Sequence, residues 1–127
     1  MWPQKREIDA IKPIIEHLGL SEKLFERTGE LSGGQRQRTA ICRALFQGGD
    51  LVLGDEPVSA VDGIQSRVVL QALTDKFETV ILAMHDVDLA LEFSTRIIGL
   101  KQGRIALDKT TAGLKRSDLD FLYKDEI

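Results

Sequence analysis

The sequence is poor in the features that mark secreted, membrane and fibrous proteins. Its 127 residues contain a single cysteine, Cys42, which excludes an internal disulfide bond and fits a reducing compartment. It lacks an apolar run near the roughly 18 residues of a spanning helix, and its N-terminus lacks the apolar core of a signal peptide. With 43% hydrophobic and 29% charged residues, a mainly disordered or fibrous chain is also excluded. We therefore expect a soluble, intracellular protein.

The sequence also lacks an excess of positive charge. Its 17 Lys and Arg residues stand against 20 Asp and Glu residues, a net charge of −3. This balance gives no electrostatic reason to expect nucleic acid or an acidic membrane surface as the main partner. Residues 1–48 carry 8 positive and 6 negative charges, and residues 49–127 carry 9 positive and 14 negative. The first part is therefore slightly basic and the second clearly acidic.

The first 48 residues are predicted to be mainly helical. Apolar residues three and four apart predict a helix over residues 7–18, in which Pro13 would delay the start or produce a kink. Residues 21–25 suit a short second helix, and residues 32–45 a third with its apolar residues on one stripe.

From residue 51 the pattern alternates between strands and helices. Short continuous apolar runs predict two strands buried on both faces, over residues 51–54 and 79–84. Further helices are expected over residues 62–73, 87–93 and 117–123, and a hairpin over residues 96–100 and 104–107. This order predicts an α/β fold with a mostly parallel sheet, flanking helices and an antiparallel edge hairpin.

The run Leu-Ser-Gly-Gly-Gln at residues 31–35 lies at the start of a predicted helix. Ser32, Gly33 and Gly34 leave backbone N–H groups free and remove the side chains that would keep an anion away. The helix dipole adds partial positive charge at the same place. A capping serine followed by loop glycines explains the same residues, so the short pattern alone leaves both interpretations open.

Two adjacent carboxylates, Asp55 and Glu56, follow the predicted strand at residues 51–54. Open α/β sheets bind their ligands at the C-terminal ends of strands. There, one carboxylate can hold Mg²⁺ through water while its neighbour positions or deprotonates a nucleophile. The alternative is a solvated acidic turn closed by Pro57.

His85 directly follows the second apolar run, again at a predicted strand end. An imidazole at that place can form a hydrogen bond to a terminal phosphate, although a lone histidine is also an ordinary surface residue. Asp62 fits either a helix cap or a contact in an active site. His85 and Asp62 are candidate site residues because of their order in the sequence relative to the other motifs.

The order and spacing of these motifs resemble the ATP-binding cassette (ABC) ATPases, the nucleotide-binding subunits of ABC transporters. Residues 31–38 resemble the family signature, residues 51–56 the Walker B strand and residues 59–62 the D-loop, and His85 is similar to the switch histidine. The resemblance extends from about Gly19 to Asp108. It implies the C-terminal part of a P-loop ATPase domain, preceded by part of the family's helical subdomain.

The resemblance also implies a role for each candidate residue. Asp55 would be the carboxylate on the Mg²⁺ side, Glu56 the general base for the attacking water, and His85 a catalytic switch residue. The residues expected to contact the nucleotide are Ser32, Gly33, Gly34, Gln35 and Asp62. In the family, ATP is held between two subunits, so that the signature of one faces the phosphate loop of the other.

A phosphate-binding loop has no candidate in the sequence, because it requires a Gly-Lys dipeptide and none occurs. The resemblance therefore divides the chain into residues 1–48, part of the helical subdomain with the signature, and residues 49–127, the C-terminal part of the ATPase core. The half that carries Walker A would be absent. We expect that ATP and Mg²⁺ serve the full-length parent, and that this chain alone neither binds ATP tightly nor hydrolyses it.

Residues 85–90 and 96–105 look like the ATPases of phosphonate importers, and importers of amino acids or phosphate and lipoprotein-release exporters share much of this stretch. The implied parent drives import in bacteria. It would pair with a second ATPase subunit and with transmembrane permease subunits, on the cytoplasmic face of the inner membrane, without nucleic acid. Two alternatives remain. One is a chromosome-maintenance or repair ATPase, which would carry coiled-coil heptads next to the signature, and no sustained heptads precede it here. The other is a non-catalytic half-domain with an interaction or regulatory role.

A half-domain leaves strands without the elements that should cover them. We therefore expect an exposed apolar surface or sheet edge, covered by self-association of this fragment.

Overall fold

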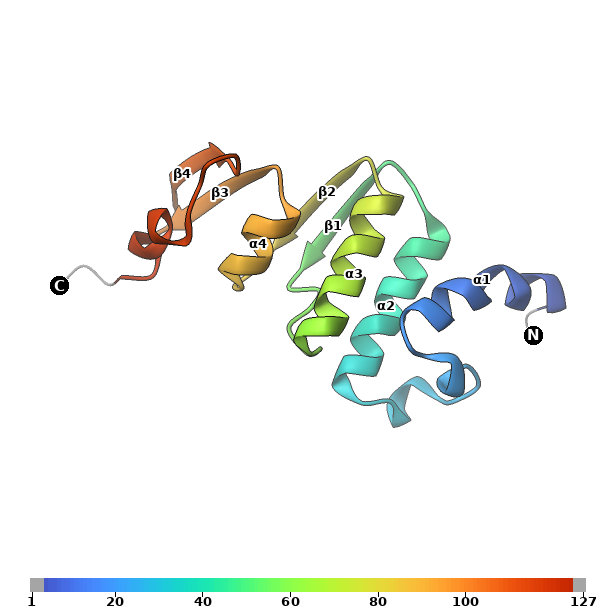
Figure 1. The fold of residues 1–127 in the computed structure, drawn as a ribbon. Helices are drawn as coiled ribbons and strands as arrows, with labels where there is room; N and C mark the ends of the chain where they lie inside the picture. Colours follow the sequence, from blue (N-terminus) through green and yellow to red (C-terminus); the bar gives the residue numbers. More distant parts are fainter. Residues whose placement is uncertain (1–3, 125–127) are drawn as a thin grey trace. The chain divides into compact units, whose positions relative to one another are not determined.

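The computed structural model describes residues 4–124, and these form two compact units that divide between Ala83 and Met84. The first unit contains helices α1 to α3 and strands β1 and β2, and the second contains α4, β3 and β4 (Figure 1). The predicted α/β class is therefore confirmed. None of the helices in residues 4–124 is both long and apolar enough to cross a membrane.

The first unit opens with two helices, α1 (Lys5–His17) and α2 (Gly33–Gln47). Pro13 lies on the exposed side of α1 and does not end it, because proline removes only one hydrogen bond of the helix. The predicted helix over residues 21–25 is only the 3₁₀ turn Ser21–Lys23, and a second turn, Thr28–Glu30, follows. Arg38 of α2 ties the two helices together, because its Nη1 donates to the carbonyl oxygen of Leu18 at 3.1 Å.

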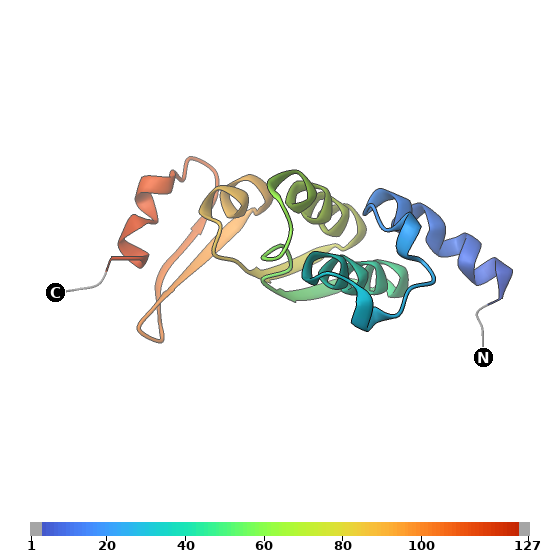
Figure 2. The ribbon, with the colours of Figure 1, turned by 90° about the horizontal axis from the view of Figure 1, so that it is seen from below.

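Strands β1 (Leu51–Asp55) and β2 (Thr79–Ala83) pair in parallel and are joined by α3 (Gly63–Lys76). In Figure 1 and in the view turned by 90° in Figure 2, α2 and α3 lie side by side over one face of this sheet. The core lies beneath these helices. Its fully buried side chains are those of Leu18, Val69, Leu70 and Leu73.

The opposite face of the β1–β2 sheet is uncovered in the part of the chain that the structure describes. The two strands alternate between exposed and half-buried residues, so the expectation that they are buried on both faces is wrong. Leu51, Leu53 and Ile81 are 52%, 70% and 56% exposed. Because side chains alternate along a strand, all three lie on one face and form an apolar surface, here called the open sheet face.

The second unit contains α4 (Val87–Phe93) and the antiparallel hairpin of β3 (Arg96–Lys101) and β4 (Arg104–Thr110). The hairpin turn places Gln102 and Gly103 at φ of 49° and 73°, as two-residue hairpin loops require. Among the described residues, β3 and β4 pair only with each other and form a sheet of their own rather than an edge of the β1–β2 sheet.

The predicted last helix over residues 117–123 is wrong. The structure has two 3₁₀ turns there, Arg116–Asp118 and Asp120–Leu122. Their backbone hydrogen bonds join residues three apart, for example from the N–H of Leu122 to the carbonyl oxygen of Leu119. Such bonds define the tighter 3₁₀ geometry, which is used in short pieces.

Candidate functional site

The start of α2 is capped by its own side chains. The backbone N–H of Gln35 donates to Oγ of Ser32 at 3.2 Å, and the N–H of Ser32 donates to Oε1 of Gln35 at 2.9 Å. This reciprocal capping box satisfies two backbone N–H donors, those of Ser32 and Gln35. Within residues 4–124, the N–H groups of Gly33 and Gly34 have no hydrogen-bond partner. An anion at this helix end would therefore meet these two glycine N–H groups and the hydroxyl hydrogen of Ser32.

The two glycines differ in their surroundings. A Cβ on Gly34 would lie 2.6 Å from the carbonyl oxygen of Ala60, whereas a Cβ on Gly33 would meet nothing within 4 Å. Gly34 is therefore required for the close approach of α2 to residues 56–62, the loop that follows β1. Among the described residues, no close contact of this kind requires a glycine at position 33.

This difference predicts opposite effects on stability. Gly34→Ala should lower the free energy of unfolding by about 1–3 kcal/mol, because the added methyl group displaces backbone rather than a flexible side chain. Gly33→Ala should leave it unchanged or raise it by up to about 1 kcal/mol, since alanine favours a helix over glycine. Urea unfolding of the two variants measures the difference, and equal losses would contradict the assigned contact.

The two carboxylates lie at the C-terminal end of β1, but their backbones differ. Asp55 is the last residue of β1 and is exposed, whereas Glu56 is half-buried and has a φ of 49°. A residue other than glycine in this left-handed region costs on the order of 1–3 kcal/mol and persists where its surroundings enforce it. The N–H of Glu56 donates to the carbonyl oxygen of Ala83 at 2.9 Å, which extends the parallel pairing by one bond beyond Asp55.

Sequence reasoning missed Gln37, which joins α2 to this loop. Its Nε2 donates to the carbonyl oxygen of Glu56 at 2.9 Å and to Oγ of Ser59 at 3.1 Å, and its Oε1 accepts from the N–H of Ala60 at 3.0 Å. The available signal was spacing, because residues three apart share a face of a helix and Gln37 lies three after Gly34.

Asp62 is a helix cap. Its Oδ1 accepts from the backbone N–H of Gln65 at 2.8 Å at the start of α3. This is one of the two roles that the sequence left open, and it accounts for an aspartate at this position without any ligand.

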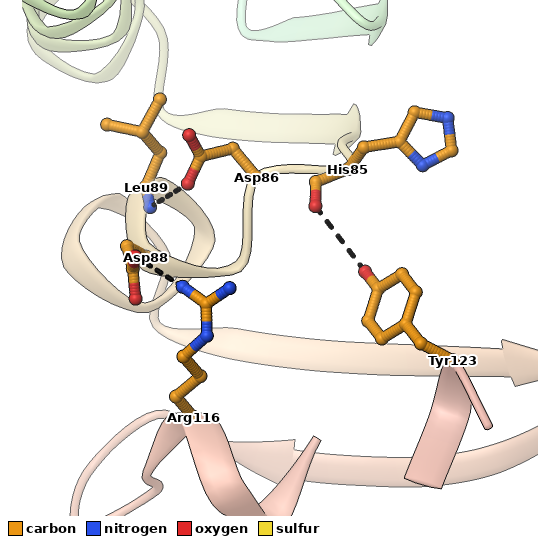
Figure 3. Close-up of polar contacts among 6 residues, drawn as sticks. All are labelled: His85, Asp86, Asp88, Leu89, Arg116 and Tyr123. Carbon is orange, nitrogen blue, oxygen red and sulfur yellow. Dashed lines mark hydrogen bonds and ion pairs between the residues drawn. The ribbon is translucent and has the colours of Figure 1, made fainter. Parts of the chain in front are cut away.

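His85 lies in the second unit, just before α4, and is exposed. Its carbonyl oxygen accepts a long hydrogen bond, 3.5 Å, from the hydroxyl of Tyr123, while its imidazole points away from that tyrosine (Figure 3). Asp86 caps α4 by accepting from the N–H of Leu89 at 3.0 Å, and Asp88 pairs with Arg116. The backbone beside His85 is thus held at several points.

The structure brings together, in the first unit, the start of α2 and the loop that carries Glu56 and Asp62, with Asp55 at the end of β1 directly before this loop. His85 belongs to the second unit. Burial raises the pKa of the Cys42 thiol on α2, and on the hairpin the hydrogen bonds from Arg96 hold the pKa of Asp108 below its usual value.

The described residues contain no group of three or more His, Cys, Asp or Glu side chains that could hold a metal ion. Asp55 is an exposed carboxylate at the end of its strand.

Comparison with known proteins shows which family the chain resembles. Residues 4–59 match the family described as ABC transporter. The phosphonates import ATP-binding protein PhnC 2 of Pseudomonas aeruginosa strain UCBPP-PA14 is 43% identical, over 88% of this chain and 43% of the relative. The phosphonates import ATP-binding protein PhnC of Caulobacter vibrioides is 38% identical, over 98% of this chain and 48% of the relative.

Solved structures agree with this assignment. The ATP-binding cassette MJ0796, in a dimeric post-hydrolysis state bound to ADP and Pi, has a TM-score of 0.74 and is 29% identical, over 87% of this chain and 50% of that chain. The chain is therefore similar to the ATP-binding proteins of ABC transporters, and among them to the phosphonate-import members. It spans about half the length of the curated relatives it matches.

Proposed function

We propose that this chain supplies the signature and the hydrolytic carboxylates of the ATP-hydrolysing subunit of a bacterial ABC importer for phosphonate-like substrates. The observation that carries the proposal is that one compact unit holds the glycine-rich start of α2 against the loop that follows the Asp55–Glu56 strand end. The phosphonate-import relatives support the substrate class. Residues 1–48 then belong to the helical subdomain and residues 49–127 to the ATPase core.

In this proposal each candidate residue has a separate task. Glu56 accepts the proton of the attacking water, and His85 donates a hydrogen bond to the terminal phosphate. Asp55 is a ligand of Mg²⁺, which supplies positive charge to the phosphate oxygens when bound. The residues that contact the nucleotide are Ser32, Gly33, Gly34, Gln35 and Asp62, with the glycines acting through backbone N–H groups.

The proposed partners are a second ATPase subunit and the transmembrane permease subunits, on the cytoplasmic face of the inner membrane. The dimeric state of the related cassette MJ0796 supports the first of these partners. With a signature in each subunit facing the phosphate loop of the other, the start of α2 would act on nucleotide held by the second subunit.

We further propose that these 127 residues do not bind ATP tightly by themselves, because the sequence contains no Gly-Lys dipeptide to form a phosphate loop. Calorimetric titration with Mg-ATP should give a dissociation constant weaker than about 1 mM, less than roughly 4 kcal/mol of binding free energy. A micromolar dissociation constant would contradict this proposal.

Catalysis is tested in a joined ATPase, defined as residues 1–127 preceded by the phosphate-loop half of the Pseudomonas aeruginosa relative. The proposal predicts Mg²⁺-dependent release of phosphate from ATP by the joined ATPase. A folded joined ATPase that binds ATP but releases no phosphate would contradict the assigned role of this chain.

A further inference from the structure

We propose that Gln37 is a positioning residue that holds Glu56 and the loop behind it in their working conformation. This inference deepens the proposed function and rests on it for its catalytic consequence. That the Gln37 side chain fixes the backbone of Glu56 follows from the hydrogen bonds alone.

The side-chain amide of Gln37 is held in one orientation. It uses both of its N–H hydrogens, toward the carbonyl oxygen of Glu56 and Oγ of Ser59, and it accepts from the N–H of Ala60. An amide can form four hydrogen bonds, and three are made here. The reverse orientation would place its oxygen against the carbonyl oxygen of Glu56 and its NH₂ group against the N–H of Ala60, so the network admits only this one.

The same contacts fix the backbone on both sides of Glu56. Its N–H donates to Ala83 of the neighbouring strand, and its carbonyl oxygen accepts from Gln37, both at 2.9 Å. These two bonds hold the peptide planes before and after the Cα atom, and therefore the direction in which the carboxylate leaves the chain. A glutamate with its backbone in the left-handed region needs such support, since this conformation is unfavourable for residues with a Cβ.

Gln37 also connects Glu56 to the start of α2. Gly34, three residues earlier on the same helix, approaches the carbonyl oxygen of Ala60, whose N–H is bound by Gln37. Gln37 and Gly34 therefore join the capped first turn of α2 to the loop of residues 56–60. Gln37 touches backbone and a hydroxyl group rather than reactants, which makes it a positioning residue and not a catalytic one.

The first test uses the 127-residue chain and does not depend on ATP hydrolysis. Amide hydrogen exchange at Ala60 should be about tenfold or more faster in Gln37→Ala, because that variant removes the acceptor of this N–H group. Gln71→Ala is the control, since Gln71 is an exposed glutamine on α3 whose side chain donates to Asp75. Unchanged exchange at Ala60 in a folded Gln37→Ala chain would overturn the inference.

The second test separates positioning from general stability with Gln37→Glu. This variant keeps an acceptor for Ala60 but has no hydrogen to donate to the carbonyl oxygen of Glu56. Exchange at Ala60 should stay protected while kcat of the joined ATPase falls about tenfold to hundredfold, as a displaced catalytic group would cause. The KM for ATP should stay within about threefold, because ground-state binding is untouched.

The outcomes distinguish the two proposals. A Gln37→Glu joined ATPase with the parent kcat would overturn the positioning role even if exchange behaves as expected. A joined ATPase that is inactive without any substitution would instead refute the proposed function. The exchange result at Ala60 would then decide by itself whether Gln37 fixes the loop.

Discussion

Replacing Glu56 by glutamine in the joined ATPase is expected to lower kcat by about a hundredfold to ten-thousandfold, the usual contribution of a general base. The amide has nearly the same shape as the carboxylate but cannot accept a proton from water. The backbone bonds of Glu56 to Ala83 and Gln37 do not involve its side chain, so the loop should keep its conformation. ATP binding should remain within a few-fold of the parent.

The measurement pairs phosphate release with equilibrium ATP binding on the same preparation. Glu78→Gln is a suitable control, because it removes one exposed carboxylate just before β2 and should leave kcat unchanged. If the Glu56→Gln variant kept more than about a tenth of the parent kcat, the assignment of Glu56 as the base would be wrong.

The second large effect concerns the open sheet face. We expect the 127-residue chain to self-associate through Leu51, Leu53 and Ile81, because each such side chain gains about 1.5–3 kcal/mol when it is fully buried. Leu53 and Ile81 are register partners on adjacent strands. The double variant Leu53→Lys with Ile81→Glu places opposite charges side by side, which keeps the strand pairing favourable.

This double variant should weaken self-association by at least about tenfold, measured as the dissociation constant in sedimentation velocity. The control replaces two exposed apolar residues away from the sheet, Ile64→Lys with Phe46→Glu, and should change the constant little. A parent chain that remains monomeric at high concentration and binds no hydrophobic dye would contradict the expectation.

Much of the secondary structure follows from local patterns. The apolar runs locate β1 and β2 within a residue or two, and the spacing of apolar residues gives the bounds of α4 without error. Residues 117–123 also carry a helical pattern, but a segment this short is marginal without tertiary support and forms two 3₁₀ turns instead. Burial on both faces of β1 and β2 could not be predicted from apolar runs alone, because coverage depends on which elements pack against the sheet.

Part of the candidate site also follows from local sequence patterns, and part depends on tertiary contacts. The motif order predicts that Ser32 lies at a helix start and that Asp55 and Glu56 lie at a strand end, and the structure places them there. The role of Gln37 depends on a contact 19 residues away in sequence, and the left-handed backbone of Glu56 has no local sequence signal. Both arise from tertiary packing of α2 against the loop, which propensity and spacing do not describe.

The most direct test of the central claim compares phosphate release from Mg-ATP by the 127-residue chain and by the joined ATPase. The account predicts no release above background from the chain alone, and release by the joined ATPase that depends on Mg²⁺ and is lost with Glu56→Gln. Hydrolysis by the chain alone, or a joined ATPase that folds and binds ATP without hydrolysing it, would contradict the claim that this chain supplies the signature and the base.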